Sequence, residues 1–289
     1  MHHQLQQLPE LGIGIGFRRQ ISEAIFSNSG EIDWLEIISE NFMNIGGSAR
    51  QLLEQTMARF PVIPHGVNLS VGGTDPINRK YLQQLHRLLE DIDSPWVSDH
   101  LCYTSNKGRY AQQLLPLPRT KEVVKHVVAR VREVQETLER PFLLENITYY
   151  MTFSESTMSE AEFLSEVCEK ADCGILLDLN NIVVNAKNFA LDEREFIDGI
   201  DKERVVQMHI AGHKTCHDWV LDTHAEPVTS EVYDFLDYSL RRLKPKAILL
   251  ERDDNFADFA EILSELRTIR ECASRADIIA NTEGALQCH

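Results

Sequence analysis

The 289-residue sequence predicts an α/β protein folded as a (β/α)8 TIM barrel. Two observations support this. Eight short apolar segments recur along the chain, and an amphipathic stretch follows each of them. We therefore expect one domain over residues 1–289, with a core of about 12–272 and flexible termini. A doubly wound open sheet is the alternative, but Gly12–Gly16 lacks GxGxxG spacing, which favours the barrel.

The expected strands are rich in Ile, Val and Leu on both faces, as strands buried between helices are. In chain order they are Gly12–Phe17, Asp33–Ile38, Val62–Leu69, Trp96–Leu101, Phe142–Glu145, Gly174–Leu179, Val205–Ile210 and Ala247–Glu251. The expected helices show apolar residues at helical spacing. They are Arg19–Phe26, Ser48–Arg59, Pro76–Asp91, Arg119–Glu139, Ser159–Ala171, Asp192–Gly199, Ser230–Leu243 and Asn255–Cys272.

The charge balance is strongly acidic, with 29 Lys and Arg against 45 Asp and Glu and a net charge of −16. Such a surface disfavours nucleic acid and anionic membranes as partners. The polar start of the chain lacks the apolar core of a signal peptide. The six cysteines form no CxxC pair, as is typical of reduced thiols. We expect a cytoplasmic protein with no nucleic-acid or membrane partner.

Polar residues gather where the expected strands end, the position of the active site in TIM barrels. These strand-end and loop residues are His65, Asn68, Asp99, His100, Glu145, Asn146, Asp178, Asn181, His209, His213, Asp222, His224 and Glu251. Four buried carboxylates could not all stay ionised without cations. A mixture of imidazole and carboxylate suits Zn, Fe, Mn or Co. The residues therefore predict a multinuclear metal site.

Three further expectations concern the surroundings of this site. Asp99, Asn146 and Asn181 are expected to orient the ligands. Asp222 and His224 are expected on an extended segment, where alternate side chains share one face and could hold one metal. Glu40 and Asn41, just past the second strand, and Asn68 are candidates for the mouth where the substrate enters.

Eight segments occur in a familiar order: HGVNLS, SDHLCY, LLPLPRT, LLENITYY, LLDLNN, MHIAGH, DTHAEPV and LLERD. From about Gly12 to Cys272 the chain resembles the multinuclear non-haem iron-dependent oxidative enzymes, the family of the methanobactin biosynthesis B subunit. The resemblance implies a xylose-isomerase-like barrel that holds two or three iron ions and oxidises cysteine residues of ribosomally made precursor peptides with O2. Zinc or manganese could occupy the site in preparations. A small partner protein that presents the peptide is also implied.

Matching the motifs to those of the family implies a set of metal ligands. The set is His65, His100, Glu145, Asp178, His209, Asp222, His224 and Glu251, with His213 and Asn181 less secure. No residue is singled out as the general base.

Three other functions stay open at this point. A trinuclear-zinc phosphodiesterase of the endonuclease IV type would carry Asp-x-x-His where this chain has Asp178 and Asn181. A sugar isomerase would need fewer strand-end histidines. A non-catalytic metal-binding barrel is the third alternative.

Overall fold

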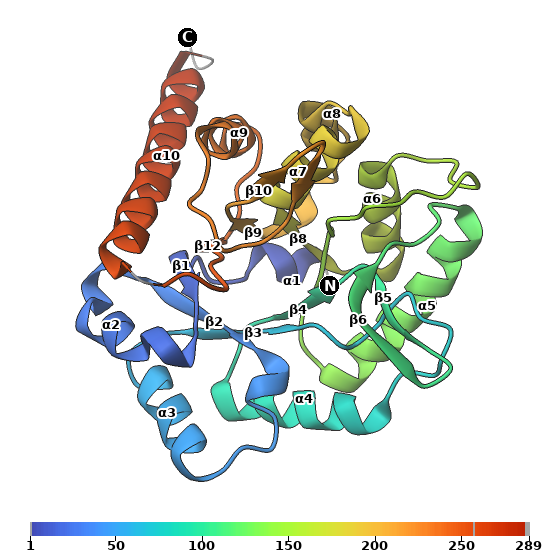
Figure 1. The fold of residues 1–289 in the computed structure, drawn as a ribbon, viewed down its shortest axis with the longest axis horizontal. Coiled ribbons are helices and arrows are strands. Elements are labelled where there is room, and N and C mark those ends of the chain that lie inside the picture. The colour runs from blue at the N-terminus through green and yellow to red at the C-terminus, as the bar shows by residue number, and fades with distance from the viewer. Residues whose placement is uncertain (1, 257, 287–289) are drawn as a thin grey trace.

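A computed structural model describes residues 2–256 and 258–286. Eight parallel strands close into a barrel in the order β1-β12-β9-β8-β7-β4-β3-β2, surrounded by helices (Figure 1). The barrel strands are β1 (Gly12–Gly16), β2 (Trp34–Ile38), β3 (Val62–Gly66), β4 (Val97–His100), β7 (Phe142–Glu145), β8 (Gly174–Asp178), β9 (Val205–Ile210) and β12 (Ala247–Leu250). All eight expected strands are present, so the predicted TIM barrel is confirmed.

Helices cover the outside of the barrel and pack on it through a large apolar core. They are α2 (Ser22–Ser27), α3 (Gly47–Met57), α4 (Arg79–Ile92), α5 (Lys121–Leu138), α6 (Glu160–Ala171), α7 (Leu179–Phe189), α8 (Glu193–Gly199), α9 (Ser230–Leu240) and α10 (Phe259–Leu286). Short 3-10 turns occupy Arg19–Ile21, Ser29–Glu31, Ser39–Asn41 and Lys202–Arg204. Within the described residues, no helix is both long and apolar enough to cross a membrane.

Helix α7 is an element that the sequence analysis missed. It begins directly after β8, because the Asp178 carboxylate accepts a hydrogen bond of 2.6 Å from the backbone N–H of Asn181 and so caps the first turn. Asn181 therefore lies in the first turn of a helix and not in a loop after the strand.

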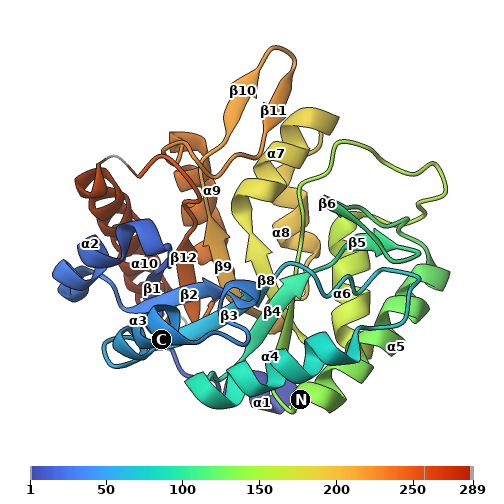
Figure 2. The same cartoon turned by 60° about the horizontal axis from the view of Figure 1, so that its bottom comes forward.

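Two hairpins, also not expected, lie beyond the ends of the barrel strands (Figure 2). One is formed by β5 (Tyr103–Asn106) and β6 (Arg109–Leu115), the other by β10 (Lys214–Cys216) and β11 (Trp219–Leu221). Their strands are too short, or too polar, to stand out by alternation of apolar residues. Figure 2 shows the β10–β11 hairpin projecting beyond this end of the barrel.

The residues before the first strand differ from the expected flexible end. His2–Gln6 form a short helix, α1, and Leu5 is only 2% exposed. Leu5 belongs to an apolar cluster with Trp34 of β2 and Trp96, which precedes β4. Apolar burial thus extends the core in front of residue 12. Met1 and residues 287–289 lie outside the described residues.

Candidate metal centre

The first group of candidate ligands comes from β3, β4 and β7. Oε2 of Glu145 lies 3.2 Å from Nε2 of His65 and 3.3 Å from Nε2 of His100. The two imidazole Nε2 atoms are 3.3 Å apart. On its other side, Nδ1 of His65 lies 2.8 Å from Oγ of Ser98, which leaves Nε2 directed at the group. Burial lowers the pKa of His100 to about 4, so its imidazole is neutral and able to bind a metal.

The second group shares Glu145 with the first. It consists of Glu145, Asp178, His209 and Glu251, from β7, β8, β9 and the residue after β12. Nδ1 of His209 lies 3.1 Å from Glu251 Oε2, 3.3 Å from Glu145 Oε1 and 4.0 Å from Asp178 Oδ2. The ligand atoms of these four residues all lie within 4.8 Å of one another.

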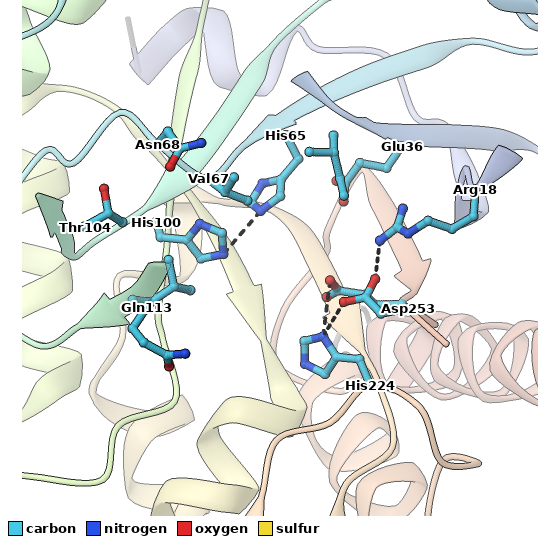
Figure 3. A pocket seen from close by; sticks show the side chains of 13 residues that line it. Arg18, Glu36, His65, Val67, Asn68, His100, Thr104, Gln113, His224 and Asp253 are labelled. Carbon is cyan, nitrogen blue, oxygen red and sulfur yellow. Dashed lines mark hydrogen bonds and ion pairs between the residues drawn. The ribbon is translucent and has the colours of Figure 1, made fainter. Parts of the chain in front are cut away.

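The third group shares Glu251 with the second and is seen beside His65 and His100 in Figure 3. Nδ1 of His224 lies 3.2 Å from Glu251 Oε1 and 3.6 Å from Asp253 Oδ2. Because a carboxylate has two oxygens, Glu145 and Glu251 can each link two neighbouring cation positions. The three groups thus form one continuous chain of ligands across the barrel mouth.

The chemistry of this donor set fits bound cations. Oε2 of Glu145, Oδ2 of Asp178 and Nδ1 of His209 are buried and have no partner in hydrogen-bond geometry. Leaving such atoms unsatisfied is costly, and coordination to a metal would satisfy them. Burial, and then the charge of Glu145, raise the pKa of Asp178 well above its ordinary value. A divalent cation would reverse that effect and keep the carboxylate ionised.

Within the groups, histidines and carboxylates shift each other's pKa values through electrostatic interactions. Burial opposes ionisation of Glu145, but the neighbouring imidazoles of His100 and His209 lower its pKa to about 2. Burial likewise disfavours a charged His209, but Glu36 and Glu145 together raise its pKa well above the usual value. A protonated His209 thus balances carboxylate charge that a bound metal ion would also balance.

The side-chain amides of Asn146 and Asn181 are not available to bind a metal. They form hydrogen bonds that link the ends of β7 and β8. Asn146 exchanges two hydrogen bonds of 2.9 Å with the backbone of Asp178. The Asn181 amide donates to the backbone oxygen of Asn146 at 3.0 Å and accepts from Thr148 Oγ1 at 2.6 Å. Asn146 therefore holds the backbone of Asp178, and Asn181 holds its carboxylate through the backbone N–H.

His213 and Asp222 lie in a hydrogen-bonded line that leads to His224. Nδ1 of His213 is 2.8 Å from Oδ1 of Asn180, and the Asn180 amide donates to Asp222 Oδ1 at 2.7 Å. That carboxylate oxygen lies 2.7 Å from Nε2 of His224. Asp222 and His213 are absent from the three described ligand groups. This geometry makes them residues that position His224.

The expectation that Asp222 and His224 share one face of an extended segment is wrong. His224 has a φ of 47°, in the left-handed region, so the chain turns between the two residues. The turn folds the imidazole back onto the carboxylate. His224 consequently offers Nδ1, and not Nε2, to Glu251.

The four remaining predicted residues have separate places. Asp99 turns away from the groups: its carboxylate accepts hydrogen bonds from the backbone N–H of Leu69 and His100, and burial raises its pKa to about 7. Asn68 is exposed and lines a cavity of about 440 Å3 that opens onto the ligand groups. Glu40 and Asn41 do not line it, contrary to expectation.

Glu40 instead supports the loop after β3. Its Oε1 accepts hydrogen bonds from the backbone N–H of Val67 and Asn68 and from the Tyr81 hydroxyl, at 2.7–3.0 Å. The carboxylate is held below the loop by these three donors, which is why it does not reach the mouth.

Two residues of the site were missed by sequence reasoning. Glu36 is 5% exposed in the middle of β2, and its Oε2 accepts from Gln207 at 2.6 Å and lies 3.1 Å from Nε2 of His209. A carboxylate in the apolar strand WLEII was the signal that could have revealed it. Asp253 belongs to the third group and pairs with Arg18, but a loop aspartate carries no such signal.

Two open cavities lead to the groups, one of about 440 Å3 and one of about 320 Å3. Both are lined by His100, Gln113, Leu114, His224 and Glu251, so they meet at the ligands. Gln113 and Leu114 come from β6, so the β5–β6 hairpin borders both cavities, and Figure 3 shows Gln113 at the larger one.

Residues 12–274 match the model of a family described as "RiPP precursor modification enzyme MbnB/TglH/ChrH". The chain belongs to this family. RiPPs are ribosomally made peptides that are modified after translation. The family covers the barrel and all three ligand groups.

Curated relatives agree with this membership. A UPF0276 protein of Anaeromyxobacter sp. (strain Fw109-5) is 42% identical over 276 residues, covering 96% of this chain and 97% of the relative. A UPF0276 protein of Caulobacter vibrioides is 39% identical, covering 90% of this chain and 93% of the relative. MbnB/TglH/ChrH membership thus rests on nearly full-length similarity.

Solved structures are similar in fold. A D-psicose 3-epimerase from Clostridium cellulolyticum H10 superposes with a TM-score of 0.60 at 12% identity, covering 91% of this chain and 98% of the epimerase. A xylose isomerase domain protein from Planctomyces limnophilus gives a TM-score of 0.60 at 9% identity, covering 93% and 99%. At such identities the likeness shows a xylose-isomerase-like barrel and nothing about the reaction.

Proposed function

We propose that this MbnB/TglH/ChrH family member holds two or three iron ions and uses O2 to modify cysteine residues of a ribosomally made precursor peptide. The observation that carries the proposal is the continuous chain of three ligand groups, linked by Glu145 and Glu251. The family description supports a precursor peptide as substrate. We further propose a cytoplasmic location and a small partner protein that presents the peptide.

The proposed ligands are the sequence-predicted set without Asp222, which positions His224, and with Asp253 added. When bound, iron supplies Lewis acidity that deprotonates a coordinated thiol and the capacity to exchange electrons with O2. His65, His100 and Glu145 would hold the ion in the first group, and Ser98 fixes the direction of His65. His224, Glu251 and Asp253 would hold the ion in the third group, beside the entrances through which a peptide reaches it.

The chain's own groups prepare the site for an anionic thiolate. His209 and Glu251 lie 3.1 Å apart, so a cationic imidazole partly neutralises the carboxylates before substrate enters. Arg18, the one cationic side chain lining the larger cavity apart from histidines, pairs with Asp253 and holds it beside His224. Asn146 and Asn181 keep Asp178 in place beneath them.

Elemental analysis combined with Mössbauer spectroscopy tests the metal assignment. The protein is expressed with added iron and purified without oxygen. Two or three irons per chain support the proposal. Stoichiometric zinc without iron uptake contradicts it and would direct attention to phosphodiester hydrolysis.

Incubation with peptide tests the reaction itself. The iron-loaded protein is mixed with cysteine-containing precursor peptides encoded near its gene, with and without any adjacent small protein. We expect O2 consumption together with a mass change at cysteine. The matched Cys→Ser peptide should stay unchanged, and a mass change in that control would refute the role of cysteine.

A further inference from the structure

Two exposed apolar side chains line the smaller cavity. Among the described residues, the large hydrophobic side chains that are exposed are Tyr110, Tyr150, Met151, Leu191, Trp219 and Leu221. Tyr150 and Met151, 46% and 51% exposed, line the cavity that also contains Glu145, His224 and Glu251. Concentrated exposed apolar surface marks binding sites more often than chance exposure.

Trp219 extends this apolar surface away from the cavity. Its ring centroid lies 6.1 Å from that of Tyr150 and 6.2 Å from that of Phe189. Trp219 and Leu221 alternate with the buried Val220 along β11, so both project from the same, outward face of the hairpin. The apolar surface therefore continues from Tyr150, at the cavity, to Trp219 of the β10–β11 hairpin.

The hairpin is held rigidly in this position. The Asn188 side chain of α7 donates to the backbone oxygen of Val220 at 2.9 Å and accepts from its N–H at 2.8 Å, as a neighbouring strand would. Tyr150 is also fixed, because its hydroxyl accepts a 3.0 Å hydrogen bond from the backbone N–H of Asp222. Rings presented in a fixed arrangement lose little entropy when a ligand binds.

We propose that Tyr150, Met151 and Trp219 form a subsite for an aromatic or large aliphatic side chain of the peptide substrate, near the residue that is modified. This inference rests on the proposed function. A peptide is the occupant that fits, because the apolar side chains adjoin a cavity that leads to the ligands. A peptide whose reactive residue reaches His224 through the smaller cavity places adjoining residues against Tyr150 and Met151. Aromatic rings pack on Tyr and Trp, and the Met sulfur adds favourable contacts to ring edges.

The three tryptophans make the subsite directly observable. Trp34 and Trp96 are fully buried, whereas Trp219 is 43% exposed. A ligand at the subsite should therefore change the fluorescence of Trp219 and its quenching by acrylamide. This readout is independent of turnover.

The experiment uses the metal-loaded full chain without oxygen, so that no peptide is consumed. The probes are synthetic peptides of Gly and Ser with one central Cys, in which Phe replaces Ser at each position in turn. We expect Phe at one or two positions near Cys to tighten binding by roughly fivefold to tenfold, with a change in Trp219 emission. Trp219→Ala and Met151→Ala should abolish that preference when binding is followed with a labelled peptide.

Two controls separate the subsite from other effects. Leu191→Ala removes an equally exposed side chain that does not line the cavity, and it should keep the Phe preference. Tyr150→Phe keeps the ring but removes the hydroxyl that holds Asp222, so it should keep the preference as well. Equal affinity for Phe and Ser peptides, or a preference that survives Trp219→Ala, would overturn the subsite.

The outcome is distinguishable from failure of the proposed function. A Phe preference with no mass change after oxygen is admitted would support the subsite and refute oxidation of these peptides. Oxidised peptides without any Phe preference would refute the subsite alone. Trp219 emission that depends on protein concentration, with no response to peptide, would assign the surface to self-association and overturn the proposal.

Discussion

Oγ of Ser98 lies 2.8 Å from Nδ1 of His65, inside the barrel between two neighbouring strands. This contact fixes the ring so that Nε2 faces Glu145. Outer residues of this kind typically account for about 10-fold to 100-fold in metal affinity. Ser98→Ala should therefore weaken metal binding by about that factor, measured by competition with a chelator of known affinity.

The matched control is Ser94→Ala, which removes another buried hydroxyl. Ser94 Oγ donates to the backbone oxygen of Trp96, before β4 begins. Its loss should lower stability without changing metal affinity. Equal metal affinity in Ser98→Ala and the native protein would show that the His65 ring needs no such support.

Glu145 belongs to two ligand groups, whereas His65 belongs to one. Glu145→Gln should therefore lower the occupancy of two cation positions, and His65→Ala that of a single position. Metal content per chain after dialysis against the same metal buffer distinguishes the variants. A loss of equal size in both would contradict the sharing of Glu145.

Metal removal should lower thermal stability. Ions that bind only the folded state contribute about 4 kcal/mol when present at a thousandfold excess over Kd. For a chain of this length, that corresponds to a fall in Tm of roughly 7 °C. Calorimetry with and without a chelator checks the value, and an unchanged Tm would argue against bound metal in the native protein.

The barrel could be predicted because its strands carry their own signal. Gly174–Asp178 and Ala247–Leu250 are buried on both faces, so each appears as an apolar run, which in the first strand extends up to the terminal Asp178. Helix α7 could not be predicted in the same way, because its first turn, with Asn180 and Asn181, appears polar although it is buried. Its capping by Asp178 becomes evident only from the structure.

The candidate ligands were predictable for a related reason: they follow recognisable strands, and the ends of parallel strands meet at one edge. Asp253 and Glu36 escaped prediction. Asp253 becomes part of the third group only through the turn that brings His224 beside Glu251. Glu36 lies within β2, and a single carboxylate in a strand usually faces solvent. Only the closed barrel shows that this one is buried beside His209.

Glu160, the first residue of α6, gives the fold a defined pH dependence. Burial raises the pKa of its carboxyl to about 7, while Arg119 acts in the opposite direction. Between the ordinary value of 4.5 and about 7, the folded chain therefore binds this proton more tightly than the unfolded chain does. The stabilisation is fully present below pH 4.5 and is lost as the pH rises through 7.

Glu160→Gln removes that proton equilibrium. From pH 5 to pH 8, the free energy of unfolding of the native protein should fall by about 2 kcal/mol relative to the variant. Urea denaturation at several pH values, with chelator in all samples, measures the difference. Glu155→Gln, at an exposed position, should show a profile parallel to that of the native protein.

Leu5 closes the end of the barrel opposite the ligand groups. The sequence analysis had predicted that this part of the chain is flexible. Its side chain is 2% exposed and packs with Trp34 and Trp96. Leu5→Ala would leave a cavity there and should lower the free energy of unfolding by about 2 to 4 kcal/mol. Leu5→Met conserves most of the volume and should cost about 1 kcal/mol or less. Since the substitution lies at the far end of the strands, metal content at low temperature should be unchanged. If urea denaturation gave equal stability for Leu5→Ala and the native protein, the first helix would contribute nothing to the core.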